Sequence, residues 1–113
     1  MEELIKNVKH GEEFSLRNLV QVEPGRVNSI TLSQTPGCKI TVFAIDAGEG
    51  MSSHAATGDA MVTCLEGKAQ IVIDDIVHEV SPGQTIVIPA NAPHSVKALE
   101  PYKMLLVVVK PQE

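Results

Sequence analysis

The strongest structural signal in the chain is the segment Gly83-Gln84-Thr85-Ile86-Val87-Ile88-Pro89-Ala90-Asn91-Ala92-Pro93-His94. Its centre, Ile86–Ile88, is a β-branched run typical of a buried strand, and a Pro-Gly turn precedes it. Pro89 and Pro93 exclude a helix from the loop between them and hold His94 at the start of the next strand. A histidine fixed in this way suits ligand binding or catalysis. The alternative is an ordinary half-buried histidine after a turn that the prolines shape.

On both sides of this segment, short runs of alternating apolar and polar residues are separated by turns rich in glycine and proline. They predict nine short strands, at residues 14–22, 27–32, 38–44, 60–65, 69–73, 76–80, 85–88, 94–98 and 102–109. Asp74-Asp75 is predicted as a two-residue hairpin turn. Residues 1–12 predict either one helical turn or an extended arm, and Gly48 and Gly50 interrupt the pattern. Because no long helix is predicted, the strands indicate an all-β sandwich or barrel.

The chain has 113 residues, enough for one domain and too few for two. Its net charge is −5, and its aromatic residues are two phenylalanines and one tyrosine. Nucleic-acid binding is therefore disfavoured, because phosphate needs a positive surface and bases need aromatic platforms. Cys38 and Cys64 form no CxxC pair and are predicted to be free thiols. The N-terminus lacks the apolar core of a signal peptide, and the longest apolar run, Met104 to Val109, is too short for a membrane helix. We expect a cytoplasmic protein without nucleic-acid or membrane partners.

The chain resembles the cupin family through two spaced motifs. One motif reads Gly83-x5-Pro89-x-Asn91-x2-His94-x3-Ala98, and the other reads Gly48-x5-His54-x-Ala56-x3-Ala60-x6-Gly67. The frame of the family is matched at Gly48, His54, Gly67, Gly83, Pro89 and His94. The resemblance covers roughly residues 38 to 109, the motif-bearing barrel, and leaves residues 1–37 as an N-terminal arm and strands of the same single domain, 1–113. It implies a conical β-barrel of jelly-roll type, the double-stranded β-helix.

A complete cupin site, as the resemblance implies, binds a divalent metal ion with three histidines and one glutamate. In this chain Ala56 stands at the second histidine position, Ala60 at the glutamate position and Ala98 at a motif asparagine. His54 and His94 remain as metal ligands, and two histidines alone leave a weak and open site. The resemblance therefore predicts either one divalent ion (Zn, Ni, Fe or Mn) or no cofactor.

Two further residues are candidates for completing that site. Asp59 is the nearest carboxylate, but its strand parity is opposite to that of the family's glutamate and it follows a Thr-Gly turn. Bonding to local backbone is therefore the favoured interpretation of Asp59. Cys64 shares the inward parity of Ala60 and Val62, and its thiolate is a soft metal ligand. A small core residue is the favoured interpretation of Cys64.

The predicted ligand pocket is lined by His54, His94, Ala56, Ala60, Val62, Cys64 and Ala98. Alanines in place of larger ligands enlarge a cavity and make it less polar, which favours an apolar or mixed ligand. The alternative is that the alanines fill a shrunken barrel. No catalytic residue is assigned.

Three functions fit these residues, and we favour a small-molecule-binding module in which the two histidines fix the ligand. An enzyme of isomerase, lyase or dioxygenase type is the alternative, with a metal as Lewis acid or the histidines as general acid and base. A structural oligomerisation domain is the third, since fold alone does not determine function. A homodimer is expected, because residues 42–45 and 104–107 are apolar on both faces and both faces need cover. Cover by the arm within one monomer is the alternative.

Overall fold

The computed structural model describes residues 2–112, which contain nine strands and one short 3-10 helix. The helix is η1 (Leu16–Asn18), and the strands are β1 (Val27–Thr35), β2 (Cys38–Ile45), β3 (Gly50–His54), β4 (Asp59–Glu66), β5 (Ala69–Ile73), β6 (Ile76–Val80), β7 (Thr85–Ile88), β8 (His94–Ala98) and β9 (Tyr102–Val109). The all-β prediction is confirmed. Within the described residues, no helix is long and apolar enough to cross a membrane.

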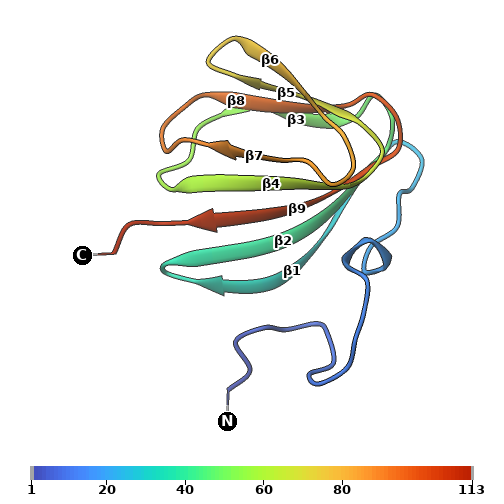
Figure 1. The fold of residues 1–113 in the computed structure, drawn as a ribbon, viewed down its shortest axis with the longest axis vertical. Coiled ribbons are helices and arrows are strands. Elements are labelled where there is room, and N and C mark those ends of the chain that lie inside the picture. Colours follow the sequence, from blue (N-terminus) through green and yellow to red (C-terminus); the bar gives the residue numbers. More distant parts are fainter. Residues whose placement is uncertain (1, 113) are drawn as a thin grey trace.

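The strands form two antiparallel sheets that pack face to face as a barrel (Figure 1). The larger sheet has the order β1-β2-β9-β4-β7, and the smaller sheet has the order β3-β8-β5-β6. The last strand of the chain, β9, therefore lies in the middle of the larger sheet, bonded to β2 and β4. Strands β6 and β7 are the edges of their sheets, and no ladder joins them in the described part of the chain.

The core lies between the sheets, where side chains of alternate residues meet. Phe43, Met104 and Cys64 are cross-strand neighbours on β2, β9 and β4, and all three belong to the apolar cluster between the sheets. Ile71 and Val96 contribute to the same cluster from β5 and β8. This alternation confirms the period of two from which the strands are predicted.

The larger sheet is also apolar on its outer face, as predicted. Val42 and Ala44 are fully buried there, although their chain neighbour Phe43 faces the core. Part of the outer cover comes from η1, which contacts β4 and β9. The Lys103 ammonium donates a hydrogen bond of 2.6 Å to the carbonyl oxygen of Arg17. This bond gives a buried charge a partner and fixes the N-terminal segment on the sheet.

The predicted strand at residues 14–22 is wrong. The backbone turns there into η1, where the amides of Asn18 and Leu19 donate to the carbonyl oxygens of Ser15 and Leu16. Alternating apolar residues are not sufficient for a strand, because its backbone also needs a neighbouring strand to bond. The order of the larger sheet gives this segment no such neighbour.

Strand β3 is missing from the prediction because Gly48, which precedes it, and Gly50, its first residue, interrupt the sequence pattern. Gly50 is required by the close approach of β8, since a Cβ atom at this position would overlap the carbonyl oxygen of Val96. The register of β3 with β8 also shifts between Met51 and His54, which hides the alternation.

The hairpin turn at Asp74-Asp75 is confirmed. Ile73 pairs with Ile76, so two residues form the turn, and their φ angles are 48° and 67°. Positive φ at both central positions is the geometry of a type I′ turn, whose twist matches that of the strands.

Residues 2–12 form an arm of bends and a turn, with neither the predicted helical turn nor a fully extended backbone. The amide of Lys6 donates to the carbonyl oxygen of Leu32 at 2.6 Å, and the hydroxyl of Ser33 donates to that of Leu4 at 2.7 Å. The arm therefore follows the free edge of β1 and projects from the barrel (Figure 1).

Candidate functional site

Two histidines that are far apart in the sequence form one pair. His54 ends β3, His94 begins β8, and the ladder places them directly opposite each other. Their ring centroids are 4.3 Å apart and their planes are tilted by 57°. His94 is 7% exposed, whereas His54 is exposed. One imidazole of the pair is therefore buried, and solvent reaches the other.

The backbone holds both rings in the same way. Nδ1 of His54 lies 3.0 Å from the carbonyl oxygen of Ser52, and Nδ1 of His94 lies 3.0 Å from that of Ala92. A carbonyl oxygen only accepts, so each Nδ1 carries the proton. In the neutral ring, Nε2 then keeps its lone pair and can accept from a ligand or bind a metal ion.

The two loops that flank the pair are joined to each other. The amide of Asn91 donates to the carbonyl oxygen of Ala56 at 2.7 Å, which links the β7–β8 loop to the β3–β4 loop. Asn91 has a φ of 67°, in the left-handed region that asparagine tolerates better than most residues. Pro89 and Pro93 restrict the loop on either side. The histidines are therefore supported by constrained backbone.

Comparison with known proteins assigns this architecture to a family. The model of the cupin domain family matches residues 41–109, more than half of the chain. The chain belongs to the cupin family. Among solved structures, this cupin is similar to a conserved protein of unknown function from Streptococcus pyogenes, with 44% identity over 99% of this chain and 98% of that chain and a TM-score of 0.96.

Two further structures carry the family name. A cupin superfamily protein from Desulfitobacterium hafniense is 26% identical over 95% of this chain and 98% of that chain, with a TM-score of 0.91. A cupin 2 conserved barrel domain protein from Leptotrichia buccalis is 37% identical over 86% of this chain and 47% of that chain, with a TM-score of 0.84. Comparison with curated proteins finds no match.

The residues of the predicted pocket of this cupin lie in two separate places in the structure. His54 and His94 lie together, and the Asn91–Ala56 bond places Ala56 beside them. Ala98 stands at the other end of β8, four residues from His94, which corresponds to about 13 Å of strand. The predicted pocket residues Ala60, Val62, Cys64 and Ala98 are each at most 4% exposed and belong to the apolar core cluster.

The residues of this cupin do not fit a resident metal ion. Among residues 2–112, no three His, Cys, Asp or Glu side chains are placed to hold one. Oδ1 of Asp59 accepts the amide of Ala90 at 2.9 Å, so this carboxylate braces the loop backbone. The Cys64 thiol lies on β4 and donates to the carbonyl oxygen of Gly67 at 3.2 Å. Two histidine ligands remain, one fewer than the three of catalytic zinc sites.

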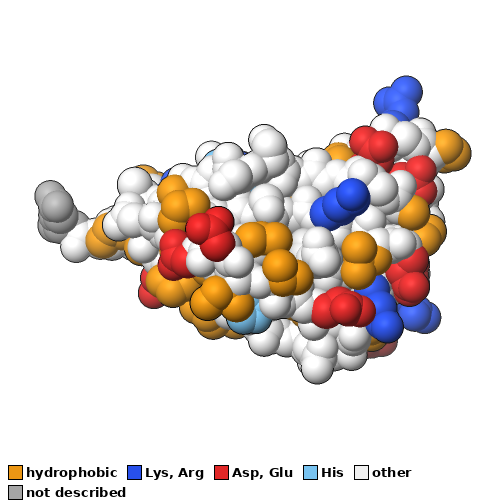
Figure 2. Space-filling model, turned by 90° about the horizontal axis from the view of Figure 1, so that it is seen from above, with side chains coloured by type: hydrophobic (Ala, Val, Ile, Leu, Met, Phe, Trp, Pro, Cys, Tyr) orange, Lys and Arg blue, Asp and Glu red, His pale blue; other side chains and the backbone are white. Residues whose placement is uncertain are grey.

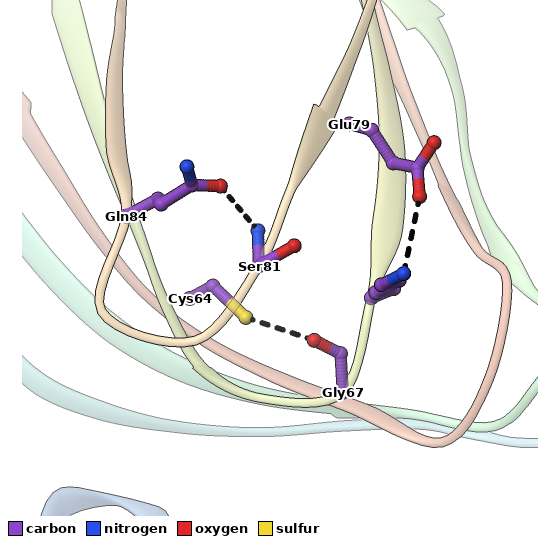
Figure 3. A network of polar contacts seen from close by, with 6 residues as sticks. Cys64, Gly67, Glu79, Ser81 and Gln84 are labelled. Atoms are coloured by element: carbon purple, nitrogen blue, oxygen red, sulfur yellow. Dashed lines mark hydrogen bonds and ion pairs between the residues drawn. The ribbon is translucent and has the colours of Figure 1, made fainter.

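The end of the barrel around Cys64 holds two neutral polar groups. Figure 3 shows the Cys64 thiol directed at the carbonyl of Gly67, beside the turn that Gln84 closes by accepting the amide of Ser81. Burial raises the pKa of the Cys64 thiol, and burial also raises the pKa of the Tyr102 hydroxyl. The Tyr102 hydroxyl has no hydrogen-bond partner among the described residues. Both groups therefore stay uncharged near neutral pH.

Sequence reasoning missed the two carbonyl groups that orient the histidines. Those of Ser52 and Ala92 each stand two residues before their histidine, and any residue type supplies a carbonyl. The sequence carries no signal for these contacts, because the register shift in β3 and the shape of the loop before β8 are visible only in the structure.

Proposed function

We propose that this cupin binds a small organic molecule at the rim of its barrel, with the imidazoles of His54 and His94 as the polar recognition groups. The observation that supports this function is the hydrogen bonding of the two imidazole rings. Each Nδ1 is occupied by a backbone carbonyl, so each Nε2 is available, on rings whose centroids are 4.3 Å apart. Two adjacent acceptors suit a ligand with two hydroxyl or acidic protons.

The surroundings of the pair favour a compact, uncharged or weakly acidic ligand. The rim carries the hydroxyls of Ser52 and Ser53, both exposed, and the small side chains of Ala55 and Ala56. A separate groove of about 330 Å³, which neither histidine lines, lies between the same two loops and the C-terminal segment. Small side chains beside a fixed polar pair are the usual composition of a ligand site.

A divalent ion has at most a secondary role in ligand binding at this site. Two Nε2 atoms leave the remaining coordination positions to water or to atoms of the ligand itself, because Asp59 and Cys64 are engaged elsewhere. We expect ions alone to bind weakly and the organic molecule to supply the specificity.

The test is saturation-transfer NMR with a mixture of small hydroxy acids, diols and phenols, on the untagged protein. We expect at least one class to bind, and to lose binding in both His54→Ala and His94→Ala. His78→Ala is the matched control, because His78 lies on β6, away from the pair. Binding that survives both rim substitutions, or that His78→Ala abolishes equally, contradicts the proposal. Titration of Ni²⁺ alone checks the expected weak ion binding.

An enzyme is the second candidate, and the unequal environments of the two rings favour it. His94 is buried and His54 is exposed, and the imidazole is the side chain that most often acts as a general acid or base in catalysis. The same NMR samples decide this point. New product signals that grow with time and depend on both histidines would establish catalysis, whereas unchanged spectra of bound ligand would leave a binding protein.

A further inference from the structure

One row of side chains crosses the inner face of the smaller sheet, from the histidine pair to the free edge of β6. Cross-strand pairing aligns His54 with His94, His94 with Ile73 and Ile73 with Ile76, on β3, β8, β5 and β6. Neighbours in such a row point to the same side of a sheet. Ile73 belongs to the apolar cluster between the sheets, so the row faces the interior of the barrel. The polar surface of the histidine pair therefore continues into the apolar surface of two isoleucines.

Both ends of this row are open to solvent, whereas its middle is covered. His94 is 7% exposed and Ile73 is 8% exposed, but Ile76 is 61% exposed and His54 is also exposed. Ile76 is bare because β6 is an edge strand, and no strand among residues 2–112 bonds to its free side. An apolar group that covers an exposed isoleucine removes apolar surface from water, which is favourable.

Backbone bonds fix Ile76 relative to the histidine pair. The amide of Asp74, in the turn before Ile76, donates to the carbonyl oxygen of Pro93, the residue before His94, at 3.0 Å. This bond holds the tip of the β5–β6 hairpin against the β7–β8 loop. Neighbouring strands are about 4.8 Å apart, so Ile76 lies two spacings, about 10 Å, from His94 along the row.

The charges near Ile76 are unfavourable for an anion. Asp74 and Asp75 adjoin it in the turn, both are exposed, and within residues 2–112 neither has an ion-pair partner. Figure 2 looks onto the side of β6 and shows apolar side chains in small patches between acidic and basic ones. A small neutral molecule therefore suits this surface better than an anion or an extended protein partner.

We infer that the ligand of this cupin carries an uncharged apolar substituent, which extends from the histidine pair past Ile73 to Ile76. The inference rests on the proposed function, in which the Nε2 atoms of His54 and His94 accept two protons of the ligand's polar head. Ile76 is then a specificity-determining residue, because it contacts the part of the ligand that the histidines do not reach. A head group alone binds weakly, since it leaves Ile76 in water.

A series of 1,2-diols tests the inference on the full, untagged chain. Two-dimensional NMR titration measures the dissociation constants of 1,2-butanediol, 1,2-hexanediol and 1,2-octanediol. A fully buried methylene strengthens binding about fourfold, and one that protein covers on a single side about twofold. We therefore expect the dissociation constant to fall about twofold per added methylene, and the amide signal of Ile76 to shift with octanediol but not with butanediol. The anion 7,8-dihydroxyoctanoate should bind more weakly than 1,2-octanediol.

Ile76→Ser should remove the dependence on chain length, whereas Val77→Ser should keep it. Val77 is the matched control, because it is 58% exposed, follows Ile76 on the same strand and points to the opposite face of the sheet. Both side chains are exposed, so circular dichroism should show folded variants.

The outcomes separate this inference from the proposed function. The inference is overturned if affinity does not change with chain length, if Val77→Ser weakens octanediol binding as much as Ile76→Ser, or if none of the diols binds. Loss of diol binding in His54→Ala supports the proposed function in either of the first two cases. Chain-length dependence that survives unchanged in His54→Ala would contradict the proposed function, although the contact with Ile76 would stand.

Discussion

Substitution of glycine by alanine should have different effects on stability at two positions of this barrel. Gly67 and Gly83 both have positive φ, 78° and 85°, but a Cβ at Gly67 would overlap the carbonyl oxygen of Pro101, whereas a Cβ at Gly83 meets nothing within 4 Å. We expect Gly83→Ala to cost about 1 kcal/mol of unfolding free energy from backbone strain alone. Gly67→Ala adds steric overlap and should cost roughly 2–4 kcal/mol. Urea denaturation measures both, and equal losses would contradict the role assigned to Pro101.

The buried thiol gives the protein a measurable sensitivity to alkaline pH. Burial raises the pKa of Cys64 in the folded state, while the unfolded chain has the ordinary thiol pKa. As pH rises above that ordinary value, the unfolded state loses the proton first, so the free energy of unfolding falls until the folded pKa is passed. Below the ordinary value the contribution is constant.

Cys64→Val removes this titration and should flatten part of the decline in urea midpoint above the ordinary thiol pKa of about 8.5. Cys38→Ala is the control, because Cys38 is only half-buried. A Cys64→Val curve that declines as steeply as that of the parent chain would show that other groups, such as Tyr102, carry the whole effect.

At the scale of residues, motif spacing identifies His54 and His94, and the structure places them side by side. The bonds that fix their tautomers could not be predicted, because backbone carbonyls have no residue identity. The sequence also does not show which of the predicted pocket residues lie at the rim of the barrel and which lie in its core. Ala56 and Ala98 each replace a larger motif residue, a histidine and an asparagine, but only the fold shows that Ala56 borders a loop and that Ala98 ends a strand inside the core.

Among the elements, the β5–β6 turn allows a stabilising substitution. Asp75 has a φ of 67°, which glycine adopts without a steric cost. Asp75→Gly should raise the unfolding free energy by about 0.5 kcal/mol, or a few degrees in Tm. Asp75→Ala, which keeps a Cβ, is the comparison and should lower Tm. A lower Tm for Asp75→Gly would mean that the aspartate contributes something other than turn geometry. Differential scanning calorimetry provides both values.

The elements that were predicted correctly are those in which an alternating or β-branched run lies between turn residues and also has a partner strand. The strands β5, β6, β7, β8 and β9 appear where alternation and turn residues indicate them. The failures concern pairing between distant segments. Residues 14–22 alternate without a partner strand, whereas β3 lacks alternation and is held by β8 more than forty residues later. Local pattern contains no information about which distant backbone lies alongside.

For the whole molecule, the homodimer that we expect from the apolar outer face of the larger sheet predicts that thermal stability depends on protein concentration. Folding coupled to association raises the apparent Tm as the protein concentration increases. We expect this rise for the parent chain and a weaker rise for Val87→Glu, because Val87 of β7 is 55% exposed in the single chain. Scanning fluorimetry over a hundredfold concentration range measures it, and a parent Tm that stays constant would argue against coupled association.

The position of β9 has a consequence for synthesis of the chain. The strand made last lies in the middle of the larger sheet, between the β1–β2 hairpin and the β4–β7 pair. Until residue 109 has left the ribosome, these two units have no shared neighbour, and each presents an open edge. We therefore expect the nascent chain to pass through a stage with two incomplete half-sheets, which the segment of β9 joins when it emerges.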